Sequence, residues 1–207
     1  MKIKSFVALS ALTFAANAMA GDLYVVGSIG QSKVKDFNKN ALDADLAADF
    51  GAVSSSDDRS DTAYKLQLGY QINKNFAVEG GYVDLGKVTY AATVTGGTLN
   101  VDVKSSGWNL AAVGILPLNE QFSLFGKLGA IHATTKLGAQ GTGVVSGWAE
   151  PGKESGWSAN YGLGASYNIN KQVAIRAEYE RFDSLGGDNV GGKSDVDLFS
   201  VGVAYKF

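Results

Sequence analysis

The chain contains no cysteine, one histidine and two prolines among its 207 residues. Without cysteine, a small exported scaffold held together by disulfides is excluded. The chain also has no excess of positive charge, with 18 Lys and Arg against 20 Asp and Glu. Nucleic-acid-binding proteins concentrate basic residues on one face, so no nucleic-acid partner is expected.

Long apolar runs are also absent after residue 20, so no transmembrane helix is expected there. At the N-terminus, Lys2 and Lys4 precede an uncharged apolar stretch over residues 5–17, and Ala18-Met19-Ala20 follows it. This pattern predicts a signal peptide over residues 1–20, cleaved between Ala20 and Gly21, and a single domain over residues 21–207. A membrane anchor or a buried helix is the alternative, but the stretch is shorter than the roughly 18–20 residues that span a bilayer.

The rest of the chain repeats a simple unit, a tight polar turn between two runs of alternating apolar and polar residues. The turn segment 70–78 (YQINKNFAV) reappears as 167–175 (YNINKQVAI), and 115–124 is a looser copy. Such units are typical of β-hairpins. Eight strands are predicted near residues 22–35, 61–72, 76–90, 104–116, 121–136, 155–168, 172–183 and 195–207. Longer loops are predicted at 36–60, 91–103, 137–154 and 184–194, and short turns alternating with long loops are typical of bacterial outer-membrane barrels.

The two faces of these strands differ in side-chain size. One face carries bulky apolar residues, such as Leu66, Leu128, Leu163 and Val203, with aromatic residues near the strand ends. The other face is mostly Gly, Ala and Ser with a few charges. The interior of an eight-stranded barrel holds little more than its own side chains, so the small face should point inward and the bulky face toward lipid. The fold class expected is therefore all-β, an eight-stranded antiparallel up-and-down transmembrane β-barrel. A soluble lipocalin-like carrier, with the faces reversed, is the alternative.

The last strand carries an uninterrupted period-two apolar series that ends on the final residue. Its members are Phe199, Val201, Val203, Tyr205 and Phe207. We interpret the series as a membrane-insertion signal. The alternative is an ordinary edge strand that ends in phenylalanine.

Several segments resemble the OmpA-like and OmpX-like eight-stranded outer-membrane proteins. They are 69–73 (GYQIN), 79–82 (EGGY), 116–118 (LPL), 126–129 (GKLG), 176–179 (RAEY) and 203–207 (VAYKF). The resemblance implies a multi-pass barrel in the cell outer membrane, in contact with its lipid and lipopolysaccharide. It also implies escort by periplasmic chaperones and recognition of the last strand by the outer-membrane assembly machinery. OmpA continues into a periplasmic peptidoglycan-binding domain, and because this chain stops at Phe207, tethering to the cell wall is not expected.

Five charged residues are expected to share the barrel interior, namely Lys65, Glu79, Lys127, Arg176 and Glu178. All lie on the small face, within several residues of a short turn. Unpaired buried charges cost several kcal/mol, so the five should pair across the narrow lumen. They would form a plug that blocks conduction, or a gate whose partners exchange. Similar proteins carry such a network, and Glu79, Lys127, Arg176 and Glu178 occupy the matching positions.

No catalytic, metal or cofactor site is expected. His132, the lone histidine, falls by parity on the lipid face, and no serine is spaced to form a catalytic triad with it. The acidic residues of segment 36–58 lack a calcium-loop spacing, and the glycine-rich segments 138–143 and 186–192 do not lie between a strand and a helix.

The function expected is a non-enzymatic scaffold that presents surface loops, for adhesion, surface recognition or an envelope structural role. The extracellular partner stays unknown. A narrow, low-conductance porin-like channel is the first alternative, and a lipid-modifying membrane enzyme and a soluble carrier are the others.

Overall fold

The structure is a computed structural model that describes residues 23–35 and 39–207. The expected signal peptide and its cleavage site, Ala20 and Gly21, lie outside the described residues. Within the described part of the chain, no helix has the length and apolar character needed to cross a membrane.

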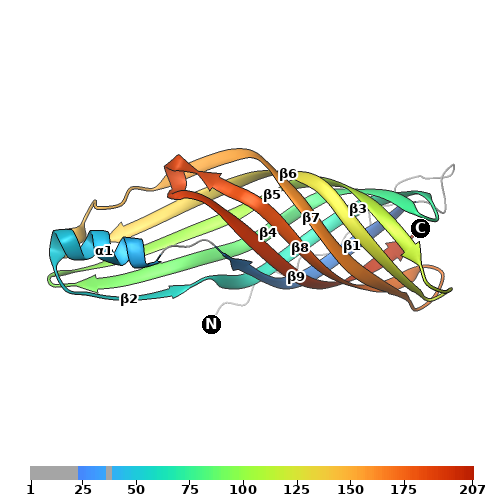
Figure 1. Ribbon diagram of the computed structural model, residues 1–207, viewed down its shortest axis with the longest axis horizontal. Coiled ribbons are helices and arrows are strands. Elements are labelled where there is room, and N and C mark those ends of the chain that lie inside the picture. Colours follow the sequence, from blue (N-terminus) through green and yellow to red (C-terminus); the bar gives the residue numbers. More distant parts are fainter. Residues whose placement is uncertain (1–22, 36–38) are drawn as a thin grey trace, which may run out of the picture.

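Strands make up most of the described chain (Figure 1). In chain order the elements are β1 (Leu23–Val34), α1 (Lys39–Phe50), β2 (Val53–Asp58), β3 (Ser60–Asn73), β4 (Phe76–Val94), β5 (Gly97–Pro117), β6 (Phe122–Gly141), η1 (Gly143–Val145), β7 (Gly152–Asn168), β8 (Val173–Gly187), η2 (Asp188–Val190) and β9 (Gly192–Lys206).

The strands close into a ring of antiparallel neighbours. β1 pairs with β3 on one side and with β9 on the other, and β4 pairs with β5. β2 is separated from β3 only by Arg59, and both pair with β4, so the two form one interrupted strand. Counted in this way, the barrel has eight strands, which confirms the predicted fold class.

The end of the barrel with the turns β3–β4, β5–β6 and β7–β8 is called the turn end, and the opposite end the loop end. Residues 91–103, predicted as a loop, instead extend β4 and β5 to a two-residue turn at Thr95 and Gly96. Gly96 has φ +89°, a conformation that glycine adopts readily. The alternation of apolar and polar residues continues through this segment, with Tyr90, Ala92 and Val94 facing inward, and that pattern sustains the strands. The loop predicted at 36–60 likewise contains α1 and β2.

The longest strands exceed what a membrane requires. β4, β5 and β6 contain 19, 21 and 20 residues, whereas about 9–11 tilted residues cross a bilayer. The surplus lies at the loop end, where Figure 1 shows the barrel drawn out toward α1 and the β4–β5 hairpin.

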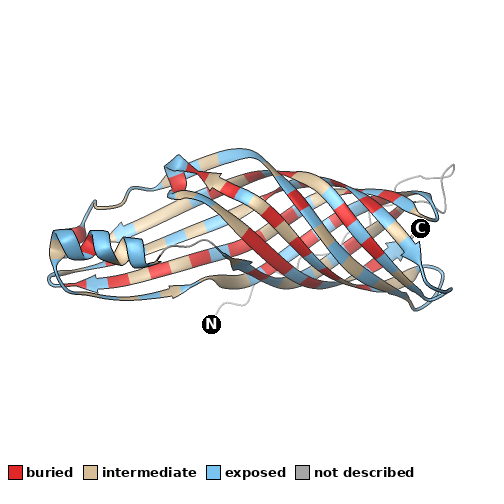
Figure 2. Ribbon diagram, viewed as in Figure 1, coloured by how far each residue is buried: buried red, intermediate tan, exposed pale blue. Residues whose placement is uncertain are grey.

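Exposure alternates along the strands, as the banding in Figure 2 shows. The bulky apolar face is the outer one, since Leu128, Trp157 and Leu163 are 69%, 72% and 67% exposed. The inner face carries the five predicted lumen charges, all of them buried, so the predicted orientation is confirmed.

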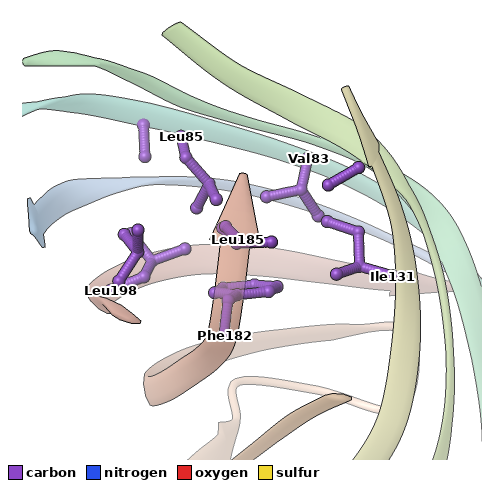
Figure 3. Close-up of a cluster of buried hydrophobic side chains, with 9 residues drawn as sticks. Val83, Leu85, Ile131, Phe182, Leu185 and Leu198 are labelled. Atoms are coloured by element: carbon purple, nitrogen blue, oxygen red, sulfur yellow. The ribbon is translucent and has the colours of Figure 1, made fainter. Parts of the chain in front are cut away.

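The interior is less uniformly small and polar than the sequence predicted. Apolar side chains fill three layers, one at the turn end with Tyr24, Val113 and Phe125, and a second nearer the loop end (Figure 3). The second layer is called the inner apolar layer, and its members are Ala63, Val83, Leu85, Ile131, Ala133, Phe182, Leu185, Val196 and Leu198. A third layer, around Leu46, Tyr90 and Leu99, lies where α1 covers the hairpin. The surplus strand length at the loop end needs a hydrophobic core of the usual kind, and the second and third layers provide it.

Candidate functional site: a charged layer across the barrel

The structure brings the five predicted lumen charges into one layer. Lys65 lies on β3, Glu79 on β4, Lys127 on β6, and Arg176 and Glu178 on β8. Strand parity turns all five side chains inward, and none of the residues is more than 6% exposed.

Each cation of this layer contacts two carboxylates. Arg176 contacts Glu79 at 2.6 Å (Nη1 to Oε1) and Glu178 at 3.0 Å (Nη2 to Oε1). The Nζ atom of Lys127 lies 2.5 Å from Glu79 Oε2 and 2.5 Å from Glu178 Oε1. Glu79 and Glu178 are thus each shared by Arg176 and Lys127, which joins β4, β6 and β8 through the lumen.

One member of the network, Glu180, is missing from the set predicted by sequence. Lys65 pairs with both Glu178 and Glu180, and the Glu180 side chain is fully buried. With Glu180 included, three carboxylates face three cations and the layer carries no net formal charge. The signal was present in the sequence, because Glu180 follows Glu178 by two residues and shares its face.

Neutral polar groups extend the network. The Tyr24 hydroxyl donates to Glu79 Oε1 at 2.7 Å, and Lys127 donates to Gln67 Oε1 at 3.3 Å. Gln67 in turn donates to Asn109 at 3.4 Å. The Tyr24 ring lies over Gly69 of the neighbouring strand β3. A Cβ atom at residue 69 would lie 2.1 Å from Tyr24 Cζ, so only glycine leaves room for the ring.

The network rests on an aromatic ring on its turn-end side. The Arg176 guanidinium lies 4.1 Å from the centroid of the Phe125 ring, a cation–π contact. Gly164 leaves room for the ring, since a Cβ atom there would lie 2.4 Å from Phe125 Cζ. The charged layer is therefore bounded by the Phe125 layer on one side and by the inner apolar layer on the other.

The lumen is hollow on both sides of this barrier. A cavity of about 250 Å³ at the turn end reaches Tyr24, Glu79 and Arg176. A second cavity of about 340 Å³ at the loop end has Leu85, Leu185 and Val196 of the inner apolar layer among its lining residues. The two cavities share no lining residue.

The proposed insertion series lies on the outer face of β9 and ends at Phe207, the residue that follows the strand. Phe199, Val201, Val203, Tyr205 and Phe207 are 40–58% exposed. β9 pairs with β8 and β1, so it closes the barrel and is not an edge strand.

His132 also faces outward, between two tryptophans. Its register partners are Trp108 on β5 and Trp157 on β7, and its ring centroid lies 5.1 Å from that of Trp157. Among the described residues, no hydrogen bond or ion pair joins the imidazole to a serine or a carboxylate. The geometry therefore assembles no triad around His132.

The acidic residues of the predicted first loop attach α1 to the barrel. Asp43 pairs with Lys39 at 2.6 Å and accepts a hydrogen bond from the Tyr90 hydroxyl at 2.6 Å. These hydrogen bonds, that from Lys39 foremost, lower the pKa of Asp43 to about 2. Asp49 accepts a hydrogen bond from the indole nitrogen of Trp148 at 3.1 Å. Over residues 23–35 and 39–207, no three potential metal-ligating side chains come together.

Comparison with known families gives one match over almost the whole chain. The model of the OmpA-like transmembrane domain covers residues 18–207. Among curated relatives, outer membrane protein A of Yersinia pseudotuberculosis is 29% identical over 200 residues, covering 92% of this chain and 54% of the relative. Against the first curated relatives the chain spans only 38–54% of their length.

Solved structures share the fold. Neisserial surface protein A has a TM-score of 0.58 at 16% identity, with 89% of this chain and 97% of that chain covered. Ail of Yersinia pestis, in complex with the heparin analogue sucrose octasulfate, has a TM-score of 0.53 at 22% identity, with 91% and 100% covered.

Proposed function

This chain belongs to the OmpA-like transmembrane domain family of outer-membrane barrels, and from that premise we propose that it is a closed, non-enzymatic scaffold whose extracellular half carries out adhesion or surface recognition. In this orientation the turn end is periplasmic and the loop end extracellular. The extracellular partner is unidentified.

The observation that carries the proposal is the barrier across the lumen. Three cations and three carboxylates pair with one another inside the wall, and an apolar layer lies on each side. Removing one partner from a buried pair leaves an uncompensated charge, which costs about 3–5 kcal/mol. Such a layer favours a permanent plug over a gate that exchanges partners.

The extracellular half has the features of a recognition surface. The β4–β5 hairpin continues well beyond the membrane level, and α1 is fixed against it through Asp43 and Tyr90. A rigid surface lowers the entropy cost of binding. One structural neighbour, Ail, binds a heparin analogue, which is consistent with recognition by barrels of this shape.

The non-enzymatic part of the proposal rests on His132. The imidazole packs against Trp157 on the outer face, and within the described part of the chain no hydrogen bond or ion pair joins it to an acid or a serine. Catalysis by a lone histidine without placed partners is a weak hypothesis.

Biogenesis is part of the same proposal. We infer that residues 1–20 direct export, with cleavage between Ala20 and Gly21. Periplasmic chaperones then deliver the chain, and the assembly machinery reads the outward series that ends at Phe207. In the membrane, the exposed apolar band contacts lipid and lipopolysaccharide.

Two measurements test the function. The purified barrel should show no steady conductance in planar bilayers. Bacteria that express it should adhere to an epithelial-cell monolayer more than the empty strain does. A variant lacking residues 91–94 and 97–100 should lose that adherence, because Ala91 pairs with Asn100 and Val94 with Gly97, so the deletion shortens the hairpin in register.

The control carries substitutions in the periplasmic turn 169–172 and should adhere as the parent does. Heat-dependent gel mobility checks that both variants fold. Equal adherence of the shortened variant and the parent, or of the parent and the empty strain, would contradict the recognition role.

A narrow channel is the second candidate, and the cavities on both sides of the charged layer favour it. Opening would require the network of Lys65, Glu79 and Arg176 to rearrange and the inner apolar layer to separate. Steady single-channel steps from the parent protein would support the channel and exclude the permanent plug.

A further inference from the structure

Four lysines form a continuous row on the outer surface of the extracellular half. Lys87 of β4 is the register partner of Lys104 of β5, Lys104 of Lys136 on β6, and Lys136 of Lys153 on β7. All four residues are exposed. We call Lys87, Lys104, Lys136 and Lys153 the lysine row.

The height of the row above the membrane follows from a second row on the same strands. Tyr82, Trp108, His132 and Trp157 are register partners in the same way, and such aromatic residues mark the membrane interface. On β5, β6 and β7, the lysine lies four residues beyond the aromatic residue. Four residues span about 13 Å along a strand, or about 10 Å along the membrane normal at a tilt of about 40°.

Hydroxyl groups fill the interval between the two rows. Ser106, Thr134 and Ser155 are register partners on β5, β6 and β7, and Thr134 Oγ1 lies 3.0 Å from Ser155 Oγ. Aromatic residues, then hydroxyls, then ammonium groups thus succeed one another outward. This order of side chains along the membrane normal matches the order of acyl chains and phosphorylated headgroup in the outer leaflet.

The row is electrostatically unfavourable for the protein alone. Like charges directly opposite on neighbouring strands are destabilising. Among the described residues, only Lys104 of the four has an ion-pair partner, Asp84 at 2.9 Å. Two other acids lie near the row: Asp61 of β3, whose carboxylate accepts a hydrogen bond from the Lys87 backbone N–H at 2.9 Å, and Asp102, two residues beyond Lys104 on the same face. These acids lie toward Lys87 and Lys104, and among the described residues Lys136 and Lys153 have no ion-pair partner, so an external anion would reduce the repulsion along the row.

We propose that the lysine row binds the phosphate groups of lipopolysaccharide in the surrounding outer leaflet. This site goes beyond the proposed recognition role, since it faces sideways into the headgroup layer and not outward from the barrel tip. Lysine stems can reach along the wall while their ammonium groups meet phosphate. Four strands about 4.8 Å apart present a cationic edge about 14 Å wide, enough for more than one phosphate.

Binding of lipopolysaccharide to the full-length protein in zwitterionic nanodiscs tests the proposal. The variant K87Q/K104Q/K136Q/K153Q removes the row. The control K33Q/K74Q/K171Q/K193Q removes the same charge from exposed lysines that do not lie in one row. Each lysine near an anionic surface contributes about a factor of five in affinity, so the row variant should bind at least about a hundredfold more weakly and the control within about tenfold of the parent.

Two further arms identify the ligand chemistry. Dephosphorylated lipopolysaccharide should bind the parent as weakly as intact lipopolysaccharide binds the row variant. Sucrose octasulfate serves as a soluble polyanion probe. If the row variant loses sucrose octasulfate but keeps its affinity for lipopolysaccharide, the row is a soluble-glycan site and the proposal is wrong. Equal affinities of the row and control variants for lipopolysaccharide would also overturn it, provided that heat-dependent mobility shows both to be folded.

Discussion

At the residue scale, charged side chains that face the lumen alternate along one strand with apolar side chains that face lipid. Glu178 and Glu180 enter the lumen while Tyr179 between them faces lipid at 40% exposure. Strand periodicity alone makes this arrangement. Which cation meets which carboxylate is then decided across the lumen by β3, β4 and β6.

The charge balance of this layer can be tested at Lys65. K65M leaves Glu178 and Glu180 short of one cation, and it should lower the free energy of unfolding by about 3–5 kcal/mol. K65M/E180Q restores neutrality and should recover most of that loss. Equilibrium urea unfolding in lipid vesicles measures both variants.

The single variant E180Q completes a double-mutant cycle for this pair. Additive effects of K65M and E180Q would mean that Lys65 and Glu180 do not interact, and would contradict the balanced network.

At the element scale, the least expected feature is the attachment of α1 to the hairpin. The helix buries Leu46 in the third apolar layer, and Leu42 and Phe50 pack half-buried against the same layer. Polar contacts add to this packing, because Asp43 bridges Lys39 and Tyr90. Burial and the neighbouring carboxylate also raise the pKa of the Tyr90 phenol.

Attachment of α1 should therefore depend on pH. The pKa of Asp43 is about 2 in the folded protein, below its ordinary value of 3.8. A lowered folded pKa contributes stability that is present above pH 3.8 and is lost as the pH falls toward 2. Amide hydrogen exchange over residues 39–50, corrected for intrinsic rates, should accelerate across this interval.

D43N should accelerate exchange of α1 already at neutral pH and remove the acid dependence. D45N, two residues further along the helix and exposed, is the matched control and should retain it. A helix whose exchange does not change between pH 4 and pH 2 would show that Asp43 does not hold it.

At the scale of the whole molecule, the barrel has the length to cross the membrane with its turn-end part and to extend beyond the membrane at its loop end. The outer aromatic row carries Trp108 and Trp157, while the third tryptophan, Trp148, lies beyond β6 against α1. Lipid should therefore surround two of the three indoles.

Fluorescence quenching by brominated acyl chains measures this division. W148F, which retains Trp108 and Trp157, should be strongly quenched in brominated vesicles. W108F/W157F, which retains Trp148, should lose little intensity. Comparable quenching of the two variants would contradict the assignment of Trp108 and Trp157 to the membrane level and of Trp148 to a level beyond it.

The sequence by itself determined the barrel and its orientation. Period-two alternation, the repeated turns and the difference in side-chain size between the faces are local properties, so they are legible without coordinates. They placed Leu163 and Val203 outside and Arg176 and Glu178 inside, as the structure has them.

Only the tertiary structure decided the lengths of the strands, the membership of the charged layer and the alignment of the lysine row. Tyr90, Ala92 and Val94 face inward from an extended part of β4. That part is stable as a strand because Leu46 and Leu99, from elsewhere in the chain, pack against the three side chains. Glu180 joins the network because Lys65 reaches it, and the four lysines align because three strand registers happen to bring them level. Register and cross-lumen contact join residues far apart in the chain, and no local pattern specifies them.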